Sequence, residues 1–152
     1  VPAFTGLGAP HWDANARGLI TGLTRNSDWK DIVRAVIESV VYQSYDLFRA
    51  MNKDGLKPKI VKVDGGMVSN NWFSQFLSDI LLLKVIRPKI QETTALGAAF
   101  MAGYQIGIYS NFDSISKIWK IDRRFKSKIN KAERTNLLKG WSQAINRALV
   151  RV

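Results

Sequence analysis

The sequence contains no cysteine and only one histidine among its 152 residues. The absence of cysteine excludes a disulfide framework and any thiolate that could bind a metal or act as a nucleophile. His11 has no second histidine with which to form a metal site and no nearby acidic pair in the sequence. We therefore interpret it as a loop residue rather than a ligand or a general base. A Ser-His-Asp arrangement and a Walker lysine loop are also missing.

Long apolar runs and a secretory signal are absent as well. Charged residues such as Arg34, Glu38 and Lys84 interrupt the apolar stretches, so none is long enough to span a bilayer. The first residues, Val1-Pro2-Ala3-Phe4, have neither the basic start nor the apolar centre of a signal peptide. They also lack an initiator methionine, which suggests a fragment or a processed product. We expect a cytoplasmic protein without a membrane partner.

The residues that are present indicate one globular domain with a real core, since 46% are hydrophobic and 23% are charged. The net charge of +11 is concentrated near the end of the chain, where residues 111–152 hold 11 Lys and Arg against 3 Asp and Glu. Apolar residues are spaced among these charges at helical intervals: Leu137, Trp141, Ala144, Ile145 and Ala148. This spacing favours a packed amphipathic helix with a solvated basic face, although a nucleic-acid-binding arm is the alternative.

Hydrophobic periodicity predicts strands that alternate with helices. In the first half of the chain, the expected elements are a loop over 1–16, a strand over 17–23, a well-buried helix over 29–51 capped from Asn26-Ser27-Asp28, and a strand over 59–64. A helix capped by Asn70 or Asn71 follows, with a core stripe of Phe73, Phe76, Leu77, Ile80 and Leu81. The remaining elements are a strand over 84–87, a helix capped by Thr93 or Thr94 that extends to about 105, a mixed extended segment over 108–130, and a helix over 131–152. This order predicts an α/β fold with a mainly parallel sheet covered by helices.

The turn after the strand over 59–64 is the best candidate for a ligand site. In open parallel sheets, ligands bind beyond the carboxyl ends of the strands. Gly65 and Gly66 would let the backbone approach a phosphate or an adenosine closely, and the helix that follows offers free N–H groups. A plain tight turn is the alternative.

Asp64 is either a metal-linked or hydrogen-bonding group, or a carboxylate that accepts bonds from strand-end N–H groups. Glu38 lies in a helix rich in Val and Ile, where a buried carboxylate needs a partner. It either orients another residue or lies at the edge of the buried face.

Several spaced motifs resemble the C-terminal domain of glycerol kinases, which are FGGY carbohydrate kinases of the actin-like ATPase superfamily. The resemblance rests on motifs that occur in the family's order along nearly the whole chain: Phe4-Thr5-Gly6-Leu7-Gly8-Ala9-Pro10 with Trp12-Asp13 and Ala16-Arg17-Gly18, then Asp31-Ile32 with Ala35-Val36-Ile37-Glu38, Val63-Asp64-Gly65-Gly66 with Asn70-Asn71, Thr94-Ala95-Leu96-Gly97-Ala98-Ala99, and Gly140-Trp141. One departure is His11, which stands where these kinases usually have Tyr or Trp.

The resemblance implies part of a ribonuclease H-like, actin-like ATPase domain that uses ATP and Mg²⁺. Residues 1–152 would form a single C-terminal portion, with a core over 17–110 and a basic helical extension over 111–152. Gly66 and Asn70 would contact the adenine nucleotide, with Gly65 beside them. The general base, the phosphate hairpin and the glycerol contacts would belong to an N-terminal domain absent from this chain, which alone would be inactive. The intact enzyme would be a homo-oligomer.

Three other interpretations remain open. One is a fragment of another sugar or polyol kinase of the same family, such as a xylulose or gluconate kinase, although the Phe4–Pro10 motif favours glycerol. A second is a non-catalytic interaction module from a split or decayed kinase gene. The third is the nucleic-acid binder suggested by the basic C-terminal segment, which the apolar spacing there disfavours.

Overall fold

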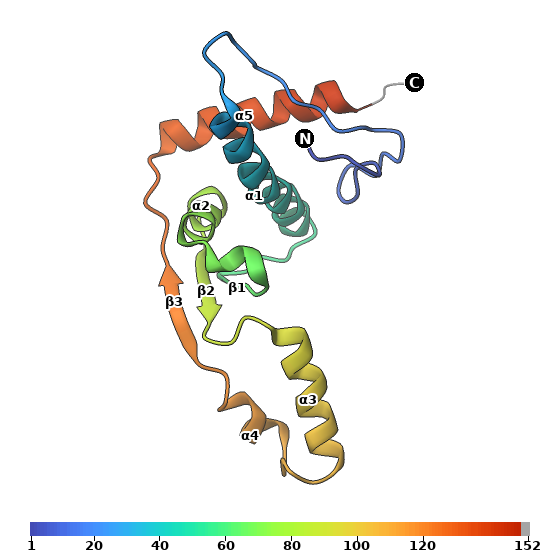
Figure 1. Ribbon diagram of the computed structural model, residues 1–152, viewed down its shortest axis with the longest axis vertical. Coiled ribbons are helices and arrows are strands. Elements are labelled where there is room, and N and C mark those ends of the chain that lie inside the picture. Colours follow the sequence, from blue (N-terminus) through green and yellow to red (C-terminus); the bar gives the residue numbers. More distant parts are fainter. Residues whose placement is uncertain (150–152) are drawn as a thin grey trace. The chain divides into compact units, whose positions relative to one another are not determined.

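The computed structural model describes residues 1–149, which form two compact units. Unit 1 comprises residues 1–57, 79–81 and the chain from 128 onward, and unit 2 comprises 58–78 and 82–127. The elements, labelled in Figure 1, are α1 (Trp29–Lys53), β1 (Ile60–Lys62), the 3₁₀ helix η1 (Gly66–Ser69), α2 (Asn71–Leu81), β2 (Lys84–Pro88), α3 (Thr93–Gln105), α4 (Phe112–Ser116), β3 (Ile121–Phe125) and α5 (Lys131–Ala148). Within residues 1–149, no helix has the length and apolarity needed to cross a membrane.

Helix α1 begins where the sequence predicts but is less buried than expected. Asp28 accepts hydrogen bonds from the backbone N–H groups of Lys30 and Asp31, and the Asp31 carboxylate accepts from the backbone N–H of Asp28 to complete a capping box. Several apolar side chains of the helix remain exposed, including Val36 at 60%. The prediction of a well-buried helix is therefore wrong for this chain. Periodicity identifies an apolar face, but it does not show what covers that face.

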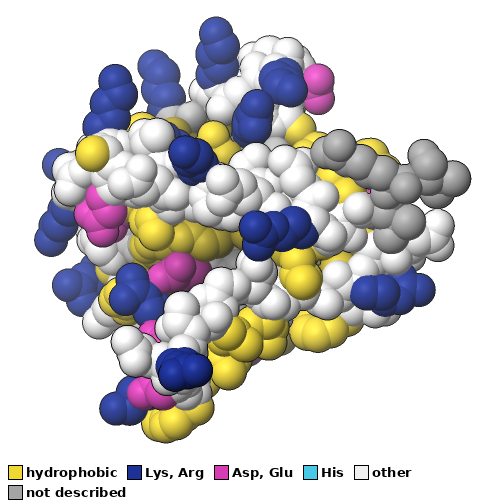
Figure 2. All heavy atoms as spheres, turned by 90° about the horizontal axis from the view of Figure 1, so that it is seen from above, with side chains coloured by type: hydrophobic (Ala, Val, Ile, Leu, Met, Phe, Trp, Pro, Cys, Tyr) yellow, Lys and Arg dark blue, Asp and Glu magenta, His cyan; other side chains and the backbone are white. Residues whose placement is uncertain are grey.

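Helix α5 confirms the prediction of a packed amphipathic helix. In Figure 1 it lies across α1, and the ring of its Trp141 stacks on Tyr42 of α1 at a centroid distance of 5.4 Å. Ile145 and Ala148 are buried on the same side of the helix. Lys and Arg side chains project from the molecular face drawn in Figure 2, with apolar side chains visible between them. The helix ends at Ala148, whereas residues 150–152 of the predicted helix lie outside the described residues.

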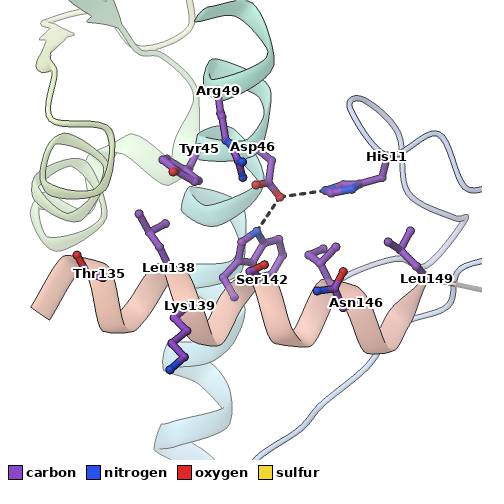
Figure 3. A pocket seen from close by; sticks show the side chains of 12 residues that line it. His11, Tyr45, Asp46, Arg49, Thr135, Leu138, Lys139, Ser142, Asn146 and Leu149 are labelled. Atoms are coloured by element: carbon purple, nitrogen blue, oxygen red, sulfur yellow. Dashed lines mark hydrogen bonds and ion pairs between the residues drawn. The ribbon is translucent and has the colours of Figure 1, made fainter. Parts of the chain in front are cut away.

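Asp46 of α1 connects three parts of unit 1. Its Oδ2 atom accepts a hydrogen bond of 2.7 Å from Trp141 Nε1 and lies 3.1 Å from His11 Nε2 (Figure 3). The three residues line an open groove of about 680 Å³ between α1 and α5. His11 is a loop residue, as predicted, and the structure gives it one acidic partner, Asp46. The partner comes from a helix 35 residues away in the sequence, a proximity that only folding creates.

Replacing Asp46 with leucine should destabilise the chain by about 1–3 kcal/mol, because Trp141 is buried and its indole N–H would lose its acceptor. Asp46→Asn is the matched control, since its amide oxygen can still accept this hydrogen bond. Urea unfolding followed by tryptophan fluorescence measures both free energies. Equal stability of the leucine variant and the parent would show that the contact contributes nothing.

The segment over residues 17–23 does not form the predicted strand. No strand among the described residues pairs with it, and Ile20 and Leu23 are mostly exposed. Its backbone is held instead by two hydrogen bonds between Leu19 and Val1, and the hydroxyl of Thr21 accepts one from Arg147. A strand needs a neighbour to satisfy its row of N–H and C=O groups, and the described part of unit 1 contains no strand that pairs with this segment.

Unit 2 contains a three-stranded sheet in the order β1-β2-β3. β1 and β2 run parallel, in register from Ile60 opposite Lys84, and β3 runs antiparallel to β2. The α/β class is confirmed, and the sheet has one parallel and one antiparallel pair of strands. The apolar stripe predicted for α2 is also confirmed, since Phe73, Phe76, Leu77 and Ile80 are buried and Leu81 is half-buried. The segment predicted to be extended contains β3 and the short helix α4.

Candidate functional site

The three residues predicted to contact a ligand lie in one turn that follows β1 in unit 2. Gly65 has φ of +84°, which favours glycine, and its N–H donates a 2.9 Å hydrogen bond to the carbonyl of Gln91. Gly66 begins η1. Asn70 then caps α2, because its Oδ1 accepts hydrogen bonds from Trp72 N and Phe73 N at 2.9 and 3.3 Å. Local backbone requirements therefore explain Gly65 and Asn70, but not Gly66.

Gly66 lies against open space. A Cβ atom built at Gly66, or at Gly65, meets no heavy atom within 4 Å apart from its chain neighbours. Gly66 has no positive φ, so a larger side chain there faces neither backbone strain nor a clash within this chain. A glycine that the fold itself does not require is consistent with a surface to which another molecule approaches closely.

The neighbouring residue Asp64 is a hydrogen-bonding group, one of the roles that its position allowed. Its carboxylate accepts a hydrogen bond from the hydroxyl of Thr93 at the start of α3. Because α3 already begins at Thr93, neither Thr93 nor Thr94 is its cap, and the prediction of a threonine cap is wrong. The N-cap is Glu92, whose side chain makes no capping hydrogen bond. Among residues 1–149 no cluster of three or more acidic or histidine side chains could hold a metal ion.

Comparison with known proteins identifies the family. The profile described as "FGGY family of carbohydrate kinases, C-terminal domain" matches residues 1–106.

The chain belongs to the FGGY family of carbohydrate kinases.

Within the family, its relatives include glycerol kinases. The chain is 53% identical to a glycerol kinase of Rhodospirillum centenum over 147 residues, which cover 97% of this chain and 30% of that protein. The structure of Plasmodium falciparum glycerol kinase with ADP matches it with a TM-score of 0.84 and 37% identity, over 100% of this chain and 31% of the other. A ligand-bound xylulose kinase of Lactobacillus acidophilus matches with a TM-score of 0.72 and 29% identity, over 95% and 29% of the two chains.

These matches confirm the resemblance drawn from the motifs and the actin-like ATPase fold. The chain spans about 30% of the length of the curated relatives that it matches. It corresponds to the C-terminal part of glycerol kinases.

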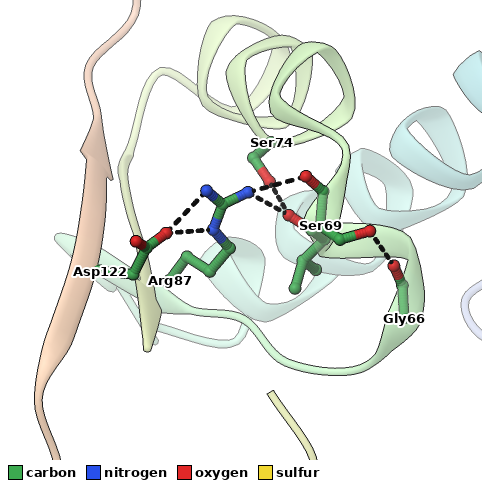
Figure 4. Close-up of polar contacts among 6 residues, drawn as sticks. Gly66, Ser69, Ser74, Arg87 and Asp122 are labelled. Carbon is green, nitrogen blue, oxygen red and sulfur yellow. Dashed lines mark hydrogen bonds and ion pairs between the residues drawn. The ribbon is translucent and has the colours of Figure 1, made fainter. Parts of the chain in front are cut away.

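In this FGGY chain, the turn is held by a residue that sequence reasoning missed. Arg87 of β2 is nine-tenths buried and lies between Asp122 and the η1 turn (Figure 4). One of its guanidinium nitrogens donates to the carbonyls of Val68 and Ser69, at 2.7 and 3.1 Å. Two others lie 2.7 Å from the carboxylate of Asp122 on β3. The available signal was an arginine between the apolar residues of a short strand, since a buried charge requires partners.

Glu38, the other acidic residue that the motifs singled out, has its partners within α1. Its carboxylate accepts hydrogen bonds from Arg34 Nε at 2.6 Å and from the Tyr42 hydroxyl at 3.0 Å. Burial raises the pKa of Tyr42, and the negative charge of Glu38 raises it further. The phenol therefore remains a hydrogen-bond donor at neutral pH. The hydrogen bonds from Arg34 and Tyr42, both in the same helix, thus offset the cost of removing the Glu38 carboxylate from water.

Proposed function

We propose that this chain forms the nucleotide-binding side of a glycerol kinase, an enzyme that transfers the γ-phosphoryl group of ATP to glycerol. The observation that carries the proposal is the open Gly65–Gly66 turn after β1. All of this chain resembles part of a glycerol kinase whose structure was solved with ADP. This chain, continuous with the remainder of the enzyme, would form the whole kinase.

The turn would bind the nucleotide mainly through its shape. Gly66 leaves room for the adenosine to approach the backbone, because no Cβ occupies that space. Asn70 would contribute its side-chain amide, since its Oδ1 already accepts two backbone bonds and thereby orients the NH₂ group. Gly65 would support the turn through its left-handed conformation and its bond to Gln91.

Mg²⁺ would neutralise phosphate charge during transfer. Magnesium in kinases is held by substrate phosphates, by water and by one or two carboxylates. The single carboxylate at this turn, Asp64, is bonded to the hydroxyl of Thr93. We therefore assign the ion to the whole kinase. The general base and the glycerol contacts are likewise proposed for the rest of the enzyme, as are a cytoplasmic location and a homo-oligomeric state.

Glycerol is proposed over other polyols for two reasons. The chain is 53% identical to a glycerol kinase but 29% identical to the xylulose kinase. It also carries the Phe4–Pro10 motif that resembles glycerol kinases. A non-catalytic module from a split gene is distinguished by reading the coding sequence upstream of Val1, because a stop codon there would favour the module.

The whole kinase should form ADP from MgATP when glycerol is added and at least about tenfold more slowly with xylulose or gluconate, because their five- and six-carbon chains are too long for a site shaped to position a three-carbon polyol. A coupled ADP assay with the three substrates at equal concentration measures this. Turnover with xylulose or gluconate but not glycerol would reassign the substrate while keeping the kinase. No ADP formation with any of them would contradict the proposal.

A further inference from the structure

The carbonyl groups at the end of η1 lie at the base of the turn. A 3₁₀ helix leaves its last carbonyls without partners inside the helix. Here the Val68 carbonyl accepts a hydrogen bond from the hydroxyl of Ser74, which is fully buried in α2. Both Val68 and Ser69 carbonyls also accept from Arg87. Among the described residues, Arg87 is thus the one that donates to both carbonyls.

A continuous path of contacts runs from the sheet to Gly66. Asp122 on β3 fixes the guanidinium of Arg87 through two contacts of 2.7 Å. Arg87 holds the carbonyl of Ser69, and the hydroxyl of Ser69 donates a 2.7 Å bond to the carbonyl of Gly66. Figure 4 shows these contacts in sequence. The planar guanidinium suits this arrangement because it presents several donors in a rigid plane, whereas a lysine ammonium cannot reach all these acceptors together.

We propose that Arg87, fixed by Asp122, is a positioning residue for nucleotide binding: it holds η1 so that the backbone at Gly66 stays open toward the nucleotide. This inference rests on the proposed function of the turn. Arg87 itself is buried against the carbonyls of Val68 and Ser69 and need not touch the ligand. Its loss should therefore affect the nucleotide rather than the polyol.

The test uses the whole kinase and compares Arg87→Met with Arg124→Met. Arg124 lies on β3 opposite Ile86 and is exposed, so its replacement removes the same charge without touching η1. Arg87→Met should raise the KM for MgATP and the calorimetric Kd for ADP by about tenfold, as expected for losing charged hydrogen bonds that hold the turn. The KM for glycerol should stay within about twofold of the parent value. Arg124→Met should leave all three constants at the parent values.

Two milder variants test the same contacts if Arg87→Met does not fold. Asp122→Asn weakens the pairing of the guanidinium, and Arg87→Lys keeps the charge but not the planar donors; each should raise the KM for MgATP by about threefold. Equal rises in the KM values for MgATP and glycerol would indicate a merely structural role and overturn the inference. So would unchanged nucleotide affinity in the folded variants. If the parent kinase fails to bind ADP, the proposed function fails first, and the inference fails with it.

Discussion

Incubated with MgATP and glycerol, the 152-residue chain should form glycerol 3-phosphate no faster than a protein-free control. Phosphoryl transfer depends on positioned groups that receive the substrate proton and stabilise phosphate charge. The resemblance assigns these groups to sequence outside this chain. General acid–base catalysis raises the reaction rate by about a hundred- to ten-thousand-fold. Each group that stabilises the developing charge raises it by about a further hundred- to thousand-fold. Product is measured by mass spectrometry over several hours.

The whole kinase at the same molar concentration is the positive control. Tryptophan fluorescence of the chain verifies folding, since Trp141 is buried in the folded unit. Product that accumulates steadily and in proportion to the chain would contradict the expectation. It would mean that residues 1–152 contain their own general base, and the division of the site proposed above would then be wrong.

In the whole kinase, Gly66→Val should weaken ATP binding by at least about tenfold and leave glycerol binding nearly unchanged. The branched side chain would occupy the space beside the backbone that the adenosine needs. The chain itself accommodates the change, because a Cβ at Gly66 meets no atom within 4 Å and the residue has no positive φ. Any loss is therefore attributable to the ligand rather than to misfolding. Calorimetric titrations with ATP and with glycerol measure the two affinities.

Gly140→Val is the matched control, because Gly140 in α5 has equally open space. It should leave both affinities at the parent values, provided that its thermal midpoint shows a folded protein. Gly65 is unsuitable as a control, since its φ of +84° makes any side chain strained. Normal ATP binding by a folded Gly66→Val enzyme would show that the turn is only structural.

Asn70 requires a different pair of variants, because its side chain also caps α2. Asn70→Ala removes the cap and should cost about 1 kcal/mol of stability, which could imitate a binding effect. Asn70→Ser keeps an oxygen that can accept from the N–H groups of the first turn and removes the NH₂ donor without adding a charge. A rise of about fivefold in the ATP Kd of Asn70→Ser, well below its melting temperature, would therefore report a direct contact. An unchanged Kd would limit Asn70 to capping.

Local signals in the sequence predicted local structure well. The stripe of Phe73, Phe76 and Leu77 identified α2, and the run Asn26-Ser27-Asp28, whose last residue is the N-cap, marked the start of α1. Trp141 and Ile145 predicted the buried side of α5. Each of these patterns depends on residues within a few turns of one another. The same kind of evidence failed for residues 17–23, because strand formation depends on a partner strand that the segment itself does not specify.

The candidate site shows the same division. The sequence by itself determined the family, the α/β class and the Gly65–Gly66 turn, because glycine spacing, caps and periodicity act over short distances. Only the tertiary structure showed that Gly66 faces open space, that Arg87 bonds to the carbonyl of Ser69, and that Asp122 holds Arg87. Only it paired His11 with Asp46. These contacts join residues 18 to 35 positions apart, and a buried charge takes whichever partners the packing of the strands and helices brings within reach.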